Sequence, residues 1–301
     1  MHAVNQEANK PMCPWTLVSR ARRLSIAGCS LVILMILLGL ALLASETRAA
    51  EQDPQTGLVE RAQNPISDLM RIPFQSNTHF GIGPNHRTGS DLKIQPLIPI
   101  ALNRNWNIIT RTILPIVKQP TLSTTDENTW GVGPTQISAF LSPSQPGLLF
   151  WGVGPIFQFP TTTDDALGSR KWGAGPTAAV FYVDGPWALG FLSNNVWSFA
   201  GSSENPNYSH FLAQYFLNYN FQERWYLTSS PIMTGNWEAT SGNKWTVPVG
   251  GGIGKVFEYR GQSFNASLQA FSNVVRPDPG PDWTLRVQFV LLLPRLGAIG
   301  Q

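Results

Sequence analysis

The chain has 301 residues, of which 43% are apolar and 13% are charged, and its formal net charge is +3. Its mean hydropathy of −0.07 is far below that of a helical membrane protein, yet the charged fraction is low for a soluble domain, in which about 25% is typical. A transmembrane β-barrel satisfies both observations, because one face of each strand meets lipid and the other lines a polar interior.

The net positive charge lies in the first 49 residues, which carry five basic and two acidic side chains; the rest of the chain has 16 of each. The sequence pI of about 9 is therefore no evidence for a nucleic-acid partner, since no basic stripe remains beyond residue 49. Both cysteines, Cys13 and Cys29, also lie in this first segment. The chain that follows has no thiol, which excludes disulfide bonds and thiolate metal sites there.

Residues 1–49 have the pattern of a secretory signal peptide. Arg20, Arg22 and Arg23 precede an apolar run at 24–44, and small residues follow up to Ala49, after which cleavage is predicted. The run has 21 residues and is long enough to span a bilayer, so an uncleaved inner-membrane anchor is the alternative. Cleavage is favoured because the pattern downstream requires export beyond the inner membrane.

Residues 50–68 show no clear period and are interpreted as a polar periplasmic lead-in, and residues 296–301 as a C-terminal tail. Between them, residues 69–295 are expected to form one all-β domain, an antiparallel transmembrane barrel of about 12 strands. The strands are expected at 70–83, 92–102, 106–117, 130–142, 148–160, 172–183, 187–200, 208–221, 225–237, 244–259, 263–275 and 282–294. Short connections at 103–105, 184–186, 222–224 and 260–262 alternate with longer ones, which is typical of such barrels.

Alternation of apolar and polar residues supports this prediction, because successive side chains of a strand point to opposite faces. In the last expected strand one face consists of Trp283, Leu285, Val287, Phe289, Leu291 and Leu293, and the other of Thr284, Arg286 and Gln288. A soluble β-sandwich alternates too, with its apolar face inside. The barrel is favoured by strands longer than the usual ~5–6 residues, by tryptophans at strand ends and by the export signal.

These tryptophans are expected to form an aromatic girdle at the two membrane interfaces, where the ring lies in the acyl boundary and the N–H among head groups. The girdle residues are Trp106, Trp130, Trp151, Trp172, Trp187, Trp225, Trp237, Trp245 and Trp283. The alternative is tryptophan in the core of a soluble fold, which would favour strand centres.

A Trp-Gly-x-Gly-Pro motif recurs every 21 residues, at 130–134, 151–155 and 172–176, and Phe80 opens a further copy. Proline offers no N–H to an anion and no helix is expected to follow, so a phosphate-binding loop is not indicated. We interpret the motif as mechanical, since glycine and proline allow bulges and bends that help a sheet to close. The alternative is that paired glycines clear space for a solute or for the N-terminal segment.

Prolines within the expected strands each remove a donor from the ladder, so some of these strands are expected to be broken or bulged. They are Pro96, Pro99, Pro115, Pro160, Pro231 and Pro248. The run of glycines at 250–252 is expected to shift the register of its strand.

Lys93, Arg111 and Arg286 lie within expected strands, opposite the apolar faces. An arginine on the lipid face near mid-membrane costs about 2–4 kcal/mol, so the lumen is the favoured location for both arginines. We hypothesise that the three side chains form a positive constriction that favours anionic or polar solutes. The alternative is that they pair with inward acids or backbone groups and fill a closed lumen.

No catalytic, cofactor-binding or metal-ligating residues are predicted. A serine and a histidine on one strand must be two residues apart to share a face. Ser209 and His210 are adjacent, and His79 and His86 have no serine at that offset. We therefore expect no enzymatic activity and no cofactor.

Seven sequence segments within residues 64–295 are distinctive enough to compare with known families. They are PFQSNTHFGIGP (73–84), IQPLIPIALNRNWNIITRTILPIV (94–117), FWGVGP (150–155), KWGAGPTAAV (171–180), GPWALGFLSNNVWSFAG (185–201), WTVPVGGGIGKVF (245–257) and GPDWTLRVQFVLLLPR (280–295). They resemble a bacterial family of outer-membrane proteins named for the meta pathway of phenol degradation. The resemblance implies an outer-membrane barrel that moves small compounds, aromatic ones among them, and it assigns no site residues. The tail at 296–301 departs from barrels generally, because it lacks a terminal aromatic residue.

The prediction is therefore a channel or transporter in the outer membrane of a Gram-negative bacterium, for the passive movement of small molecules. The alternative is a nonconducting structural or interaction barrel. Its expected partners are outer-membrane lipid, lipopolysaccharide, the solute and the barrel-assembly machinery, and nucleic acid is not among them.

Overall fold

The computed structural model describes residues 54–67, 69–121, 128–145 and 147–293. The predicted signal peptide (1–49) and the predicted tail (296–301) lie outside this part of the chain. Within the described residues, no helix is both long and apolar enough to cross a lipid bilayer.

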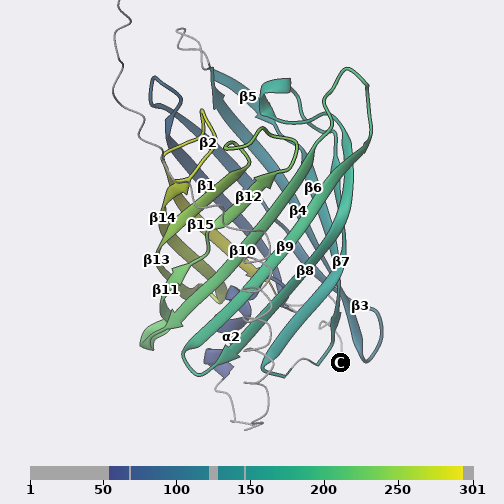
Figure 1. Cartoon of the computed structure of the whole chain (residues 1–301). Coiled ribbons are helices and arrows are strands. Elements are labelled where there is room, and N and C mark those ends of the chain that lie inside the picture. Colours follow the sequence, from purple (N-terminus) through teal and green to yellow (C-terminus); the bar gives the residue numbers. More distant parts are fainter. Residues whose placement is uncertain (1–53, 68, 122–127, 146, 294–301) are drawn as a thin grey trace, which may run out of the picture. The chain divides into compact units, whose positions relative to one another are not determined.

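One antiparallel sheet wraps around a lumen and closes on itself (Figure 1). The ring is closed by β1 and β15, which pair from Met70 opposite Leu293 to Phe80 opposite Trp283. The strands are β1 (Met70–Ile82), β2 (Arg87–Ile94), β3 (Leu97–Ala101), β4 (Trp106–Pro120), β5 (Asn128–Val132), β6 (Thr135–Pro143), β7 (Leu149–Phe159), β8 (Trp172–Asp184), β9 (Trp187–Ala200), β10 (Ser209–Asn220), β11 (Trp225–Ser229), β12 (Ile232–Asn236), β13 (Trp245–Tyr259), β14 (Gln262–Val275) and β15 (Trp283–Leu293).

Three wall strands are each interrupted once, so that β2 and β3, β5 and β6, and β11 and β12 are halves of single strands. The fifteen segments therefore make a wall of twelve strands, which confirms the predicted fold. Breaks or bulges had been expected at in-strand prolines, Pro96 and Pro231 among them, and both of these strands are interrupted there. No break had been expected in the strand at 130–142, which is interrupted at 133–134. The interruptions contain Pro96, Pro134 and Pro231; proline lacks the N–H that a ladder needs and also restricts the residue before it.

The other prolines have smaller effects. Pro99 and Pro115 remain inside β3 and β4, and Pro160 follows the last residue of β7. In β13 the register shifts between Val247 and Pro248, whereas the glycines at 250–252 keep a regular register opposite β14. The shift expected at these glycines therefore lies at the proline.

The connections differ at the two ends of the barrel. At the end where β1 begins and β15 finishes, here called the turn end, they are short and lie at 102–105, 144–148, 185–186, 221–224 and 260–261, the fourth containing η3 (Gln222–Arg224). At the opposite loop end they are mostly longer, up to 160–171, which contains η2 (Asp165–Leu167). The predicted alternation of short and long connections is therefore confirmed.

The repeated Gly-x-Gly-Pro motif lies where strands approach closely or change register. An added Cβ at Gly154 would lie 1.8 Å from the carbonyl oxygen of Ala139, and one at Gly175 would lie 1.7 Å from that of Asn195. In the Phe80 copy, the pairing of β1 with β2 is irregular between His79 and Ile82. Only glycine fits such approaches, so these contacts support the mechanical interpretation.

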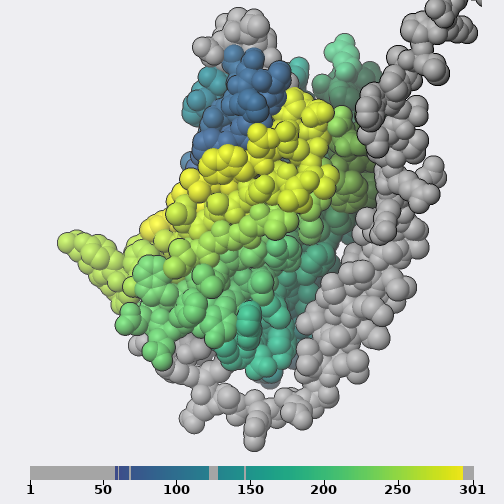
Figure 2. Space-filling model, turned by 60° about the vertical axis from the view of Figure 1, so that its left-hand side comes forward, coloured from purple at the N-terminus to yellow at the C-terminus, as the bar shows by residue number. Residues whose placement is uncertain are grey.

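The two faces of the wall have opposite chemistry. On β15, Val287 and Phe289 are 50% and 41% exposed on the outer face, whereas Thr284 and Arg286 are 8% and 5% exposed on the inner face. Figure 2 shows the C-terminal strands, coloured green to yellow, side by side across this outer wall. A soluble sandwich would bury the apolar face, so this alternative is excluded.

Candidate functional site: the barrel lumen

A helix occupies the turn end of the lumen. It is α2 (Pro54–Gln63), within the segment that was expected to be a polar lead-in (Figure 1). On this helix Val59 and Ala62 are buried, and they pack against inward-facing wall residues, Tyr226, Val256, Val290 and Leu292. The lumen wall is therefore apolar where the helix covers it, although the same strand faces are polar elsewhere.

The chain just after α2 extends this plug across the lumen. Ile66 is 1% exposed and lies in a cluster with inward residues of five wall segments, Leu97, Ile109, Phe140, Ala179 and Leu192. Burial of one such side chain stabilises by about 1.5–3 kcal/mol. We call residues 58–67 the plug.

Not every buried polar atom at the plug has a hydrogen-bond partner among the described residues. Gln63 Nε2 donates to Oδ1 of Asn220 at 2.7 Å, and Arg71 Nη1 donates to the carbonyl oxygen of Ala62 at 2.7 Å. Four buried side-chain atoms have no partner among the described residues: Gln63 Oε1, Asn64 Nδ2, Ser67 Oγ and Arg71 Nε. Each such atom costs about 1–3 kcal/mol, so the polar part of this contact is weak.

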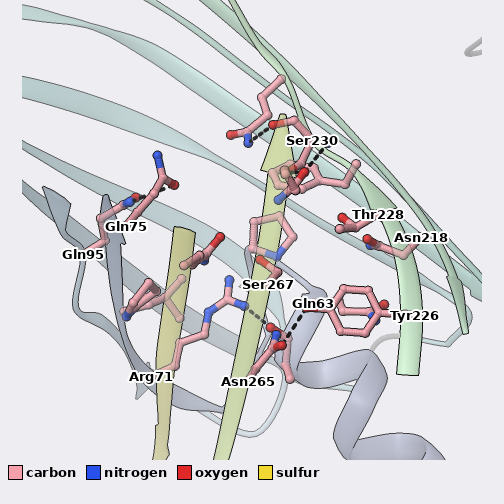
Figure 3. Close-up of a pocket in the computed structure, with 18 of the residues that line it drawn as sticks. Gln63, Arg71, Gln75, Gln95, Asn218, Tyr226, Thr228, Ser230, Asn265 and Ser267 are labelled. Carbon is pink, nitrogen blue, oxygen red and sulfur yellow. Dashed lines mark hydrogen bonds between the residues drawn. The ribbon is translucent and has the colours of Figure 1, made fainter. Parts of the chain in front are cut away.

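Beside the plug lies a cavity of about 90 Å³. Figure 3 shows amide and hydroxyl side chains reaching it from β1, β10, β11 and β14. Its lining is mostly polar and includes two arginines, and it consists of Ala62, Gln63, Pro65, Arg71, Pro73, Gln75, Gln95, Leu97, Arg111, Gln214, Phe216, Asn218, Tyr226, Thr228, Ser230, Asn265, Ser267, Gln269 and Gln288. No carboxylate is in this set. The cavity can therefore hold water or a small polar solute.

The three predicted constriction residues do not form one ring. Arg111 lines the cavity, and its Nη2 donates to Gln95 Oε1 at 2.6 Å. Lys93 is paired opposite Pro115 of β4, four residues from Arg111, which is about 13 Å along a strand. Its Nζ lies 3.5 Å from Asp91 Oδ2.

Arg286 faces the lumen from β15 and is held by the wall. Its Nε donates to Asn77 Oδ1 at 2.9 Å, its Nη1 donates to the carbonyl oxygen of Ser230 at 2.7 Å, and its guanidinium lies 4.8 Å from the ring centre of Phe271. Of the three residues, only Arg111 lines the cavity.

A second polar group lies nearer the loop end. His79 Nδ1 is 2.9 Å from Thr284 Oγ1 and its Nε2 is 2.8 Å from Asp91 Oδ1. A hydroxyl, an imidazole and a carboxylate also form the triad of hydrolases, and three strands supply them here, which a search along single strands misses. Thr284 is 8% exposed, so a substrate would have little access to its hydroxyl, and Asp91 also accepts from Asn77. The arrangement fits a hydrogen-bond network of the lumen.

Tryptophans lie near the strand ends, at both ends of the barrel. Trp106, Trp187 and Trp225 each begin a strand at the turn end, and Trp151 is the third residue of β7 at the same end. The loop-end group is Trp130, Trp172, Trp237, Trp245 and Trp283. Trp106 and Trp245 are half-buried, and the other seven are exposed. The rings of Trp237 and Trp245 pack edge to face at 5.2 Å.

Sequence reasoning missed α2 and Arg71. One signal for the helix was present, because residues 290–293 are apolar on both faces of β15, which a water-filled lumen does not explain. Arg71 lies on the same face of β1 as Gln75 and Asn77, at even spacing. This spacing would have placed it in the lumen.

The fold is similar to those of solved outer-membrane proteins. An outer-membrane channel from Pseudomonas putida F1 covers 81% of this chain and 100% of its own, with a TM-score of 0.57 and 18% sequence identity. The fold is that of an outer-membrane β-barrel. The NanC porin covers 75% of this chain and 100% of its own, with a TM-score of 0.47 and 7% identity. No protein-family model matches the chain, and no curated protein matches its sequence.

Proposed function

We propose that this barrel is a passive channel for small molecules in the outer membrane of a Gram-negative bacterium. The observation that carries the proposal is that the outer face of the wall is apolar and its inner face is polar. Val287 is half-exposed on the outside, while its neighbour Arg286 is buried and hydrogen-bonded inside. Such a wall is stable where lipid surrounds it and water fills it.

The orientation follows from the connections. Short turns face the periplasm in barrels of this kind and long loops face outward. The turn end with α2 is then periplasmic, and the tryptophans of the two ends form the girdles at the two interfaces. The loop end faces lipopolysaccharide. Export through a cleaved signal peptide and insertion by the barrel-assembly machinery are part of the same proposal.

The solute path runs through the lumen beside the plug. The cavity of about 90 Å³ lies next to Ala62 and Gln63, so a solute larger than a few waters passes only when the plug shifts. The four unpartnered polar atoms at the plug lower the cost of this movement, since water can hydrogen-bond to them once they are exposed. The resemblance of the segments at 73–84 and 94–117 supports membership of the family named for the meta pathway of phenol degradation, and it extends the proposal to aromatic compounds.

Liposome swelling tests the proposal. The purified full chain is reconstituted, and folding is checked by the heat-dependent shift on a gel. Influx of small neutral solutes above the rate of protein-free liposomes is expected, falling as solute size grows. The proposal is contradicted if the barrel folds and the liposomes remain impermeable to every solute tested.

The second candidate is a nonconducting structural or interaction barrel. The burial of Ile66 among residues of five wall segments favours it, because a plug seated this firmly closes the turn end. The same swelling assay separates the two candidates, provided that a chain with the plug displaced is measured beside the intact one.

A further inference from the structure

Two arginines lie in one row across the lumen wall. Arg71 of β1 is paired with Leu97 of β3, and Leu97 is paired with Arg111 of β4. Paired Cα atoms of antiparallel strands lie about 4.5–5.5 Å apart, so the two arginine Cα atoms are about 10 Å apart. Both side chains line the cavity, and Figure 3 shows the Arg71 guanidinium there. Two long side chains at this spacing can contact one small ligand.

Most of their N–H donors have no acceptor among the residues that the structure describes. A guanidinium has five N–H groups, and Arg111 gives one of them to Gln95. Arg71 is 8% exposed, gives one to the carbonyl of Ala62, and has a buried Nε without an acceptor. In the described part of the chain, neither arginine has a carboxylate within ion-pair distance.

The other two residues of the predicted constriction have more partners in the wall. Lys93 has Asp91, and Arg286 donates to Asn77 and to Ser230. Two positive charges without an anion, one buried (Arg71) and one half-buried (Arg111), repel each other and lose hydration. An anion that enters the cavity removes both costs, so Arg71 and Arg111 form the part of the lumen that is incomplete without a ligand.

We propose that the cavity binds a short-chain organic monocarboxylate, held between Arg71 and Arg111. The planar fork of a guanidinium matches a carboxylate with two parallel hydrogen bonds. Leu97 and Phe216 line the same cavity and offer apolar contact to the alkyl group of the carboxylate. An inorganic anion has no alkyl group to make this contact. The volume of about 90 Å³ restricts the ligand to a few carbon atoms. This inference rests on the proposed function and names the solute class that the lumen prefers.

Equilibrium dialysis of labelled butyrate against the purified full chain in detergent tests the proposal. Saturable binding of one butyrate per chain is expected, displaced by unlabelled butyrate and not by equal concentrations of butyramide or inorganic phosphate. Butyramide has the same shape without the charge, and phosphate has the charge without the alkyl group. Absence of saturable binding, or equal displacement by either competitor, overturns the assignment.

Variants locate the site. Arg111→Gln and Arg71→Gln each remove charge-assisted hydrogen bonds and are expected to weaken binding about tenfold or more. Arg104→Gln, in an exposed turn, is the matched control and should leave binding unchanged. Arg111→Gln is the decisive variant because Arg71 also holds Ala62 of the plug. Unchanged binding in folded Arg111→Gln overturns the proposal, and the competition on the wild-type chain tests it independently of any variant that fails to fold.

Dialysis does not require conduction, so the two proposals fail separately. A barrel that swells liposomes without binding butyrate contradicts only the carboxylate site. A barrel that binds butyrate and stays closed to all solutes contradicts only the channel.

Discussion

Arg286 and Asn77 stand directly opposite each other where the first and last strands meet, and Nε of the arginine donates to Oδ1 of the asparagine at 2.9 Å. Both side chains are buried in the lumen. The hydrogen bond therefore spans the seam that closes the barrel, between residues that are 209 positions apart in the chain.

Loss of this hydrogen bond should destabilise the pairing of β1 with β15. Arg286→Met is expected to lower the free energy of unfolding by about 1.5–3 kcal/mol, the usual contribution of a hydrogen bond to a charged group. Combination with Asn77→Ala should cost less than the sum of the two single changes, because the partners are in contact. Urea unfolding in lipid vesicles measures all three. Arg104→Met is the exposed control, and additivity of the two changes would show that the pair is not coupled.

Lipid contact predicts that a charge on the outer face is penalised according to depth. Leu268, 49% exposed, lies near the centre of β14, and Val274, 63% exposed, lies on the same face near its loop end. Leu268→Arg is expected to destabilise the barrel by about 2–4 kcal/mol and Val274→Arg by about 0–1 kcal/mol. Unfolding in vesicles measures the difference. Equal costs at the two positions would contradict the placement of this face in a membrane.

The plug should be released by a charge at its apolar contact. Val59 is buried against Tyr226, Val256, Val290 and Leu292, and an ionised carboxylate at this position is costly to bury. Val59→Asp is therefore expected to raise the swelling rate and to admit larger solutes, while Val59→Ala, which stays apolar, should differ little from wild type. A folded Val59→Asp barrel with unchanged solute cut-off would show that the plug does not limit passage.

The glycine motif should tolerate no side chain where two strands touch. A Cβ at Gly154 would overlap the carbonyl oxygen of Ala139, whereas one at Gly147 would meet nothing within 4 Å. Gly154→Ala is expected to cost about 1–3 kcal/mol, as forced backbone shifts do, and to lower the yield of heat-modifiable barrel. Gly147→Ala should fold as wild type does. Equal barrel yields for Gly154→Ala and Gly147→Ala would contradict the interpretation that the motif allows close strand approach.

Periodicity was sufficient to predict most of the wall. The two faces of β15 and the inward direction of Arg111 and Arg286 follow from alternation, because lipid and water impose opposite chemistry on neighbouring residues. The interruptions were not predictable one by one. Pro96 breaks a strand and Pro115 does not, since the outcome depends on which partner carbonyl loses its donor, and this is a property of the assembled sheet.

The interior was less accessible from sequence, because its contacts join distant segments. Helix α2 has ten residues and gains its stability from Val290 and Leu292, which are more than 200 positions away. Arg71 and Arg111 become neighbours only through the pairing of β3 with both β1 and β4. The hypothesised constriction of Lys93, Arg111 and Arg286 placed the three cations together, whereas the strand register places Lys93 about four residues from Arg111 along the lumen wall.

Single-channel recording in a planar bilayer tests the central claim most directly. Among the residues that the structure describes, Arg71 and Arg111 line the lumen cavity, and no carboxylate does. The purified full chain is therefore expected to give small discrete conductance steps, with a reversal potential in a salt gradient that shows preference for anions. A folded, heat-modifiable barrel that stays silent in the bilayer, with the plug in place and in the Val59→Asp variant, would contradict the account.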